Sequence, residues 1–228
     1  SAPEQAAAWL RQHAASLQTD SRHLQAGEAF IAWPGAAHDA RRYVLDALRN
    51  GAACLVEAQG AEAFDFMQEG ALVPEQAARL ALYTGLRQAT GPIAAAFYEH
   101  PSQKLDVIAV TGTNGKTSTA WWLAQALARQ SAQGAGMIGT LGIGRFINGH
   151  IQTRETGLTT PDPVMLQHNL RQWVDQGMPV CVMEASSIGI EEHRLDGMRL
   201  HTAVFTNFTQ DHLDYHGSTQ AYWQAQTV

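Results

Sequence analysis

Residues 107–127 (VIAVTGTNGKTSTAWWLAQAL) constrain the fold of this chain more than any other stretch. A short apolar run rich in β-branched residues leads to Gly112 and Gly115, and apolar residues at helical spacing begin at Thr117. Backbone N–H groups in a glycine-rich turn, the positive end of the following helix and the mobile charge of Lys116 together suit a polyphosphate. The pattern therefore predicts a strand, a phosphate-binding loop and a helix.

The loop does not have the commonest spacing of such sequences. The position five before Gly115 is Val110, where the pattern G-x-x-x-x-G-K-[ST] has a glycine. A glycine-rich turn before a helix can also be only a turn, so the prediction rests on the strand before the loop and the helix after it. In a phosphate site, the Thr117 hydroxyl would be a candidate ligand for Mg²⁺.

Composition indicates a globular protein of one large or two ordinary domains, with 228 residues of which 45% are hydrophobic. The formal net charge of −6 argues against a broad nucleic-acid surface. Cys54 and Cys181 lie in apolar, strand-like runs, which favours buried free thiols in a reducing compartment, and we expect a cytoplasmic protein. No apolar run reaches the roughly 18 residues of a membrane span, so membrane insertion is not expected.

Hydrophobic periodicity and turn signals predict an α/β fold with a mostly parallel sheet. In the first part of the chain, we expect helices at 3–18, 39–50 and 85–99, strands at 29–33 and 53–57, and a linker at 100–102 that places a domain boundary near 101–104. In the second part, we expect strands at 107–110, 180–184 and 201–206, a helix capped by Asp162 that continues to about 176, and a hairpin turn at Asn148-Gly149.

Polar residues follow several of these strands. Open α/β sheets bind ligands at the carboxyl ends of their strands, so polar groups after 107–110, 180–183 and 203–205 are expected to converge beside the loop. Glu184 ends an apolar strand, where an unpartnered carboxylate is costly, and a Mg²⁺ on bound phosphates would be a partner. Alternatively, Glu184 caps the helix that begins near Ser187.

The remaining candidates are less sharply defined. His212 lies shortly after Asn207, the residue at the end of another predicted strand, and could therefore also lie near the loop. Histidine is an unusual ligand for Mg²⁺, so the residues alone leave its role open. Arg194 and Arg154 suit anionic substrate groups, although a single arginine is more often a surface residue. Trp121-Trp122, on the helix after the loop, is expected to pack rather than to stack on a ligand.

With these residues in view, the chain resembles the ATP-dependent Mur ligases of peptidoglycan synthesis. The motifs that carry the resemblance are DSR (20–22), GTNGKT (112–117), TTPDP (159–163), MEASS followed by HR (183–194) and FTNFTQDHLDYHG (205–217). The resemblance implies a small N-terminal α/β domain at 1–101 that binds the uridine end of a UDP-MurNAc-dipeptide, and at 104–228 the first part of a central P-loop domain that binds ATP. We expect the later part of that domain and a C-terminal domain for the amino acid to lie outside this chain, which would be inactive alone.

The resemblance also implies a set of site residues. The ATP phosphates would meet Gly112, Thr113, Asn114, Gly115, Lys116, Thr117 and Ser118. The UDP-substrate would meet Ser21, Ala36, Ala37, His38, Thr159, Thr160, Ser186, Glu192 and Arg194. Thr117 and Glu184 would bind one Mg²⁺ and His212 a second, and the catalytic residues would be Lys116, Glu184 and His212. The implied enzyme, a monomer, adds a diamino acid, meso-diaminopimelate or L-lysine, to UDP-MurNAc-L-Ala-D-Glu through an acyl-phosphate made with ATP.

The sequence departs from the family pattern at several positions. Gln226 stands where a carbamoylated lysine that binds the second Mg²⁺ is expected, and a neutral amide removes one negative charge from that site. Glu192 replaces an expected glutamine and Ile188 an expected histidine, and the turn at 35–38 is also altered.

Two other interpretations stay open. Another Mur ligase, or a folylpolyglutamate synthetase, shares the GTNGKT loop, although DSR and TTPDP favour the ligases that add the diamino acid. The alternative of a different class is a non-catalytic nucleotide-binding module.

Overall fold

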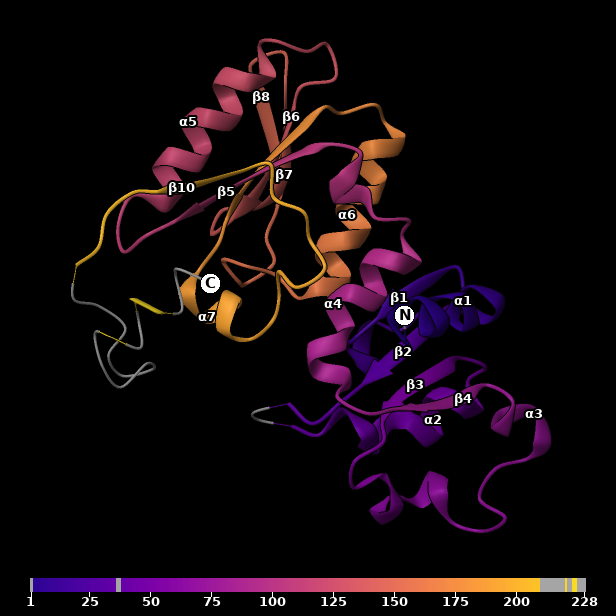
Figure 1. Ribbon diagram of the computed structural model, residues 1–228. Coiled ribbons are helices and arrows are strands. Elements are labelled where there is room, and N and C mark those ends of the chain that lie inside the picture. Colours follow the sequence, from indigo (N-terminus) through magenta and orange to yellow (C-terminus); the bar gives the residue numbers. More distant parts are fainter. Residues whose placement is uncertain (1, 36–37, 210–219, 221–222, 225–228) are drawn as a thin grey trace. The chain divides into compact units, whose positions relative to one another are not determined.

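The computed structural model describes residues 2–35, 38–209, 220 and 223–224 (Figure 1). The chain divides into two compact units, Ser1–Phe97 and Tyr98–Val228. This division falls a few residues before the predicted boundary near 101–104. The uridine-binding and ATP-binding roles of the two parts remain predictions.

The first unit is built on a parallel sheet with strand order β1-β2-β3-β4. Its strands are β1 (Ser16–Gln18), β2 (Glu28–Ala32), β3 (Ala53–Glu57) and β4 (Leu80–Tyr83), and its α-helices are α1 (Ala2–His13), α2 (Val44–Arg49), α3 (Pro74–Ala77) and α4 (Leu86–Phe97). Short 3₁₀ helices η1 (Ser21–His23), η2 (Ala40–Tyr43), η3 (Ala61–Ala63) and η4 (Asp65–Met67) join them. Phe30, Cys54 and Val56 pack against Val44 and Leu48 of α2 in one buried cluster.

The predicted strands at 29–33 and 53–57 are confirmed as β2 and β3, and the helix predicted at 85–99 is confirmed as α4. The helix predicted over 39–50 begins instead as the 3₁₀ helix η2 and continues as α2. The helix predicted over 3–18 is wrong beyond His13, because Ser16–Gln18 pairs with β2 and buries Leu17 in the sheet. Strand pairing has overridden local periodicity there.

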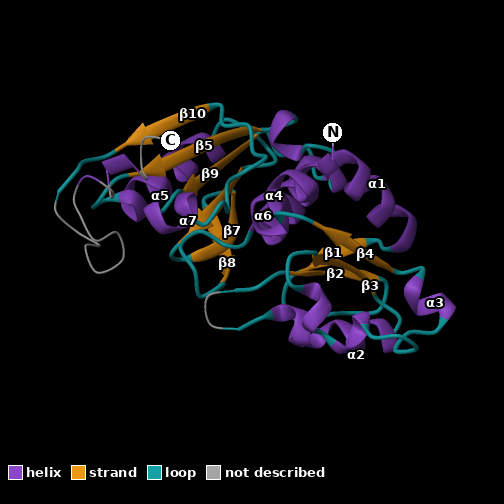
Figure 2. Ribbon diagram, turned by 60° about the horizontal axis from the view of Figure 1, so that its bottom comes forward, coloured by secondary structure: helices purple, strands orange, loops and turns teal. Residues whose placement is uncertain are grey.

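The second unit contains a six-stranded sheet with the order β10-β5-β9-β6-β7-β8. Its strands are β5 (Asp106–Thr111), β6 (Ala135–Gly139), β7 (Gly142–Ile147), β8 (His150–Arg154), β9 (Val180–Glu184) and β10 (Thr202–Phe205). Strands β10, β5, β9 and β6 are parallel, so their carboxyl ends share one edge. Figure 2 shows the common direction of β10, β5 and β9. The hairpin β7-β8 extends the sheet with antiparallel pairing.

Helices cover both faces of this sheet (Figure 1). On one face, Val110 and Val182 pack against Ala120 and Ala124 of α5 (Lys116–Ala128). On the other face, Leu166, Leu170 and Trp173 of α6 (Pro163–Asp175) pack against alternate residues of β5 and β9. A short helix, α7 (Ser187–Glu191), follows β9. Strands β6 and β9 are buried along their whole length and β5 along most of its length, as their near-continuous apolar sequences require, whereas the edge strands β8 and β10 are largely exposed.

Several local predictions for this unit are confirmed. Strand β9 has the predicted bounds, and the Asp162 carboxylate accepts hydrogen bonds from the first N–H groups of α6. The hairpin turn has positive φ angles at Asn148 (52°) and Gly149 (80°), as an Asn-Gly turn requires. The linker predicted at 100–102 is not among them, because Pro101 and Ser102 are buried in the 3₁₀ helix η5 (Pro101–Gln103), inside the second unit.

The prediction for Trp121-Trp122 has a mixed outcome. Trp121 packs edge-on against Phe146, with ring centroids 4.8 Å apart, but Trp122 is 67% exposed and its predicted packing is wrong.

Cys54 and Cys181 are both buried and free, as predicted. Burial raises the pKa of the Cys54 thiol to about 12. Within the described residues, no helix has the length and apolar character needed to cross a membrane.

Candidate functional site

The predicted phosphate loop joins β5 to α5. Gly112 and Gly115 have φ angles of +127° and +83°, which side chains rarely allow, and α5 begins at Lys116. The Lys116 ammonium group donates hydrogen bonds to the backbone oxygens of Gly112 (2.6 Å) and Thr113 (3.0 Å). The glycines therefore make the turn, and the loop's own carbonyls hold the cation over it.

The start of α5 provides the second part of an anion site. The first N–H groups of a helix have no acceptor within the helix, and they carry the positive end of its dipole. Gly115 precedes α5 and has no side chain with which to cap them. The N–H groups of Thr117 and of the exposed Ser118 lie in this first turn. A phosphate at this position would meet N–H donors and the Lys116 charge together.

Glu184 links the loop to the neighbouring strands. The residue is 1% exposed at the end of β9, and its Oε2 atom accepts hydrogen bonds from the hydroxyls of Thr117 (2.9 Å) and Thr140 (3.3 Å). Its Oε1 atom accepts a hydrogen bond from the Thr140 backbone N–H (2.9 Å). A Cβ atom on Gly139 would lie 2.1 Å from Oε1, so the carboxylate requires a glycine beside it.

The alternative role for Glu184, capping the helix after β9, is wrong. Ser186 caps α7, because its hydroxyl accepts a hydrogen bond from the Gly189 N–H at 3.1 Å. The Glu184 carboxylate instead contacts Thr117 and Thr140 at the carboxyl edge of the sheet.

The oxygens of Thr117 and Glu184 fit the chemistry of Mg²⁺, which prefers hard oxygen ligands. Among the described residues, no group of three or more His, Cys, Asp and Glu side chains converges as a metal site. Mg²⁺ is commonly bound by one or two protein oxygens together with substrate phosphates and water, and this pair matches that arrangement.

The substrate-side residues predicted in the second unit lie together. The Thr160 hydroxyl lies 3.0 Å from the Ser186 hydroxyl and donates to the Glu184 backbone oxygen at 3.1 Å. The Thr159 hydroxyl lies 3.1 Å from that of Thr140, which in turn contacts the Glu184 carboxylate. Hydrogen bonds therefore connect these predicted substrate residues to Glu184, through its backbone oxygen for Thr160 and through Thr140 and the carboxylate for Thr159.

Arg194 joins the same network. Its Nη1 atom donates to the Thr160 backbone oxygen at 2.6 Å, and its Nε atom donates to Glu192 Oε2 at 3.1 Å. A further contact between Arg194 Nη2 and the same carboxylate oxygen completes an ion pair. The alternative that Arg194 is an ordinary surface arginine does not hold, since only 17% of its side chain is exposed. Arg154 is exposed at the end of β8, and β9, β6 and β7 separate that strand from β5.

In the first unit, the predicted uridine residues follow neighbouring parallel strands. Ser21 lies in η1 after β1, and His38 is exposed after β2. Asp20 caps η1 and pairs with Arg22, whose hydrogen bonds lower the pKa of the Asp20 carboxyl to about 2. Ser21 also lines a hollow of about 470 Å³. The other lining residues are Arg22, Leu24, Gln25, Ala26, Tyr43, Asp46, Ala47, Asn50 and Ala52.

Several predicted residues are not part of this description. Ala36, Ala37, His212 and Gln226 lie outside the described residues, so their predicted roles remain predictions. Sequence reasoning missed Thr140, which follows β6. The rule that ligands bind at the carboxyl ends of strands would have found it if β6 had been recognised before its glycine-rich hairpin.

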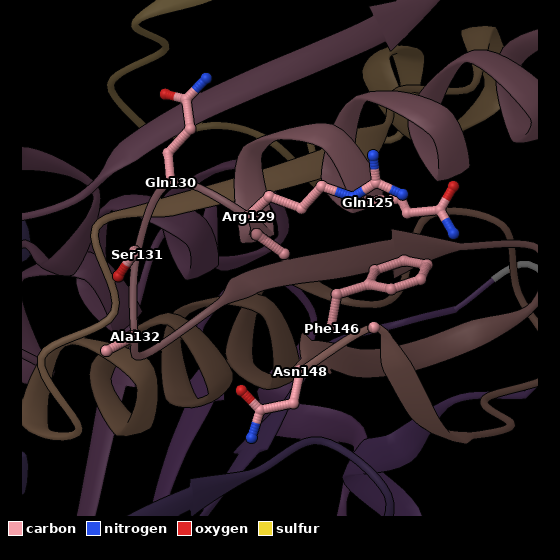
Figure 3. A pocket seen from close by; sticks show the side chains of 9 residues that line it. Gln125, Arg129, Gln130, Ser131, Ala132, Phe146 and Asn148 are labelled. Atoms are coloured by element: carbon pink, nitrogen blue, oxygen red, sulfur yellow. The ribbon is translucent and has the colours of Figure 1, made fainter.

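A hollow of about 430 Å³ lies at the far end of α5 from the phosphate loop, beside the β7-β8 turn (Figure 3). Arg129, Gln125 and Asn148 line it together with Phe146. Arg129 is the one charged side chain among the lining residues, and it follows the last residue of α5, where the helix dipole is negative. This hollow therefore lacks the group of cations that a polyphosphate needs.

A phosphate loop between a strand and a helix, with a carboxylate at the end of the adjacent parallel strand, defines an α/β nucleotide-binding protein of the P-loop class. The family described as the Mur ligase middle domain matches residues 110–227, and the chain belongs to the Mur ligase family.

Named relatives agree with this assignment. The chain is 54% identical over 230 residues to the UDP-N-acetylmuramoyl-L-alanyl-D-glutamate–2,6-diaminopimelate ligase of Acidovorax sp. (strain JS42), covering 97% of this chain and 43% of the relative. It is 43% identical to the ligase of the same name from Janthinobacterium sp. (strain Marseille), covering 96% of this chain and 42% of the relative. The chain thus spans about two fifths of the length of these relatives.

Solved structures show the same fold. A structure of a ligase of the same name matches with a TM-score of 0.68 at 32% identity, over 93% of this chain and 40% of that one. MurF from Acinetobacter baumannii matches with a TM-score of 0.61 at 21% identity, over 98% of this chain and 44% of that one, and this second likeness concerns the fold alone.

Proposed function

We propose that this chain is the substrate-binding and phosphate-loop part of an ATP-dependent ligase that adds a diamino acid to UDP-MurNAc-L-Ala-D-Glu. The hydrogen bond between Thr117 and Glu184 carries the proposal, because it joins the phosphate loop to a buried carboxylate on a neighbouring strand. The names of the relatives favour 2,6-diaminopimelate over L-lysine as the amino acid.

In this proposal, ATP phosphates bind at the start of α5. The N–H groups of the first turn and the Lys116 ammonium group neutralise part of the triphosphate charge. Thr117 and Glu184 would hold Mg²⁺, which would supply further positive charge against the phosphate oxygens. Positive charge is needed here because the substrate carboxylate and the triphosphate repel each other.

The UDP-substrate would extend along the polar network of Thr159, Thr160, Ser186 and Arg194. Its terminal D-Glu carboxylate attacks the γ-phosphorus, the bond to the bridging oxygen breaks, and ADP leaves with the electron pair. The diaminopimelate amine then attacks the acyl-phosphate carbon, phosphate leaves, and the amine loses a proton as the amide forms. The residues of this chain orient the acceptor carboxylate and hold the phosphates for in-line transfer.

Calorimetric titration of this chain tests the substrate class. UDP-MurNAc-L-Ala-D-Glu should bind more tightly than UDP, and a folate should not bind. Binding of the folate without binding of the dipeptide nucleotide would overturn the proposal in favour of a folylpolyglutamate synthetase.

A second experiment separates a ligase from a non-catalytic nucleotide-binding module. A longer protein that contains this chain is incubated with ATP, Mg²⁺, the dipeptide nucleotide and meso-diaminopimelate. One ADP and one phosphate should form for each amide. Nucleotide binding without amide formation would favour the module.

A further inference from the structure

Two residues that follow β10, Thr206 and Asn207, hold the main chain of the phosphate loop; we call this pair the loop clamp. The side chain of Asn207 accepts a hydrogen bond from the Asn114 N–H through Oδ1 (3.1 Å) and donates one to the Asn114 backbone oxygen through Nδ2 (2.9 Å). The Thr206 hydroxyl donates to the same backbone oxygen at 2.7 Å. Side chains 92 and 93 positions along the chain thus hold both polar backbone groups of one loop residue.

The backbone of the clamp also packs directly against the loop. The Thr113 N–H donates to the Asn207 backbone oxygen at 2.9 Å. A Cβ atom on Gly112 would lie 2.2 Å from the Thr206 hydroxyl oxygen and 2.9 Å from the Asn207 backbone oxygen. Gly112 is therefore needed for the close approach of these two segments as well as for its positive φ angle.

The clamp fixes the orientation of the peptide group between Asn114 and Gly115. The structure has no cis peptide bond among its described residues, and the C=O and N–H of a trans peptide point in opposite directions. Because the clamp holds the Asn114 oxygen, the Gly115 N–H points away from the clamp. Glycines at both ends of the loop would otherwise let this peptide rotate, and a rotated peptide would present its oxygen to the phosphates.

We propose that Thr206 and Asn207 are positioning residues for the nucleotide, which set the Asn114–Gly115 peptide so that its N–H faces a triphosphate. This role rests on the proposed function, since it assumes that the loop binds ATP. It acts through the loop main chain and requires no contact between the clamp side chains and the nucleotide.

Nucleotide titrations of single variants test the clamp. Thr206→Val removes the hydroxyl donor, and Asn207→Asp keeps the Oδ1 acceptor but places an oxygen against the Asn114 oxygen. Each should weaken ATP binding in the presence of Mg²⁺ by about tenfold, the upper end of the effect expected when one neutral hydrogen bond is lost. Thr206→Ser, which keeps the hydroxyl, should restore affinity to within about threefold of wild type.

Thr202→Val is the matched control, because Thr202 is the first residue of β10, the strand that precedes the clamp, and pairs with Ile108 away from the loop. It should leave nucleotide affinity unchanged, and no variant should alter the affinity for UDP-MurNAc-L-Ala-D-Glu. Equal losses of ATP affinity in Thr206→Val and Thr206→Ser, or wild-type ATP affinity in Asn207→Asp, would overturn the positioning role of the clamp.

Amide hydrogen exchange in the chain without nucleotide separates failure of the clamp from failure of the proposed function. Exchange at the Asn114 N–H, which loses its Oδ1 acceptor, should accelerate in Asn207→Ala and stay unchanged in Thr202→Val. If the wild-type chain does not bind ATP, the proposed function fails. The exchange rates then still test whether Asn207 holds the loop main chain. Unchanged exchange in Asn207→Ala would overturn the clamp.

Discussion

The Oε2 atom of Glu184 lies 2.9 Å from the Thr117 hydroxyl oxygen, although 67 positions separate the two residues in sequence. This contact joins the first turn of α5 to the end of β9. If this pair holds Mg²⁺, its oxygens supply both a neutral and an anionic ligand.

Replacement of the Glu184 charge is expected to affect nucleotide binding only when Mg²⁺ is present. Glu184→Gln keeps the shape of the side chain but removes its negative charge, and we expect the affinity for Mg²⁺-ATP to fall at least about tenfold. Fluorescence titrations with a labelled ATP, with Mg²⁺ and with EDTA, measure the effect. Glu155→Gln, at an exposed carboxylate after β8, is the control. Equal losses with and without Mg²⁺ would contradict a metal role.

Gly139 is expected to tolerate no side chain because Glu184 is its neighbour. Gly139→Ala would place a Cβ atom 2.1 Å from Glu184 Oε1 and should destabilise the chain by about 1–3 kcal/mol, the usual cost of overpacking. Urea unfolding gives the free-energy change. In a Glu184→Ala background the same substitution should cost clearly less, because the clashing group is gone. Equal costs in both backgrounds would show that the strain lies elsewhere.

The Glu192 carboxylate is expected to weaken the attraction of Arg194 for an anionic substrate. Glu192→Gln removes the charge that pairs with the guanidinium, so the affinity for UDP-MurNAc-L-Ala-D-Glu should rise about three- to tenfold, which corresponds to roughly 1 kcal/mol. Calorimetry at low and high salt measures it, and the gain should shrink at high salt. Glu191→Gln, at the exposed neighbouring residue, should change little. Lower affinity in Glu192→Gln would mean that the carboxylate itself contacts the substrate.

Glu57 makes the stability of the first unit depend on pH. Burial opposes its charge, but hydrogen bonds from the N–H groups of Gln59, Gly85 and Leu86 outweigh it, so the Glu57 pKa is lowered. A lowered pKa stabilises the fold above the unfolded pKa of about 4.3, and this contribution is lost as the pH falls through the folded pKa.

Glu57→Gln should therefore cost about 1.5–3 kcal/mol at pH 7, and the difference from wild type should shrink below about pH 4. Urea unfolding at a series of pH values checks the prediction. Glu62→Gln, in the nearby η3, is the control and should change little. A constant difference across the whole pH range would indicate a packing effect instead of a charge effect.

Predictions from the sequence are confirmed where the predicted feature depends on neighbouring residues. The strand, glycine-rich loop and helix around residues 107–127, the Asn148-Gly149 turn and the Asp162 cap all depend on neighbouring residues, and each was predicted. The position of Glu184 at the end of an apolar strand was predicted for the same reason. Strand β1 and Thr140 were missed because pairing with distant strands decides their places.

The sequence by itself therefore determined which residues could serve a phosphate site, because side-chain chemistry and local turns depend only on residues that are adjacent in sequence. Only the tertiary structure decided that Glu184 meets Thr117 and Thr140, that Ser186 rather than Glu184 caps α7, and that Asn207 holds Asn114. The parallel order β10-β5-β9-β6 is the physical reason, because it brings strand ends that are far apart in sequence to one edge of the sheet.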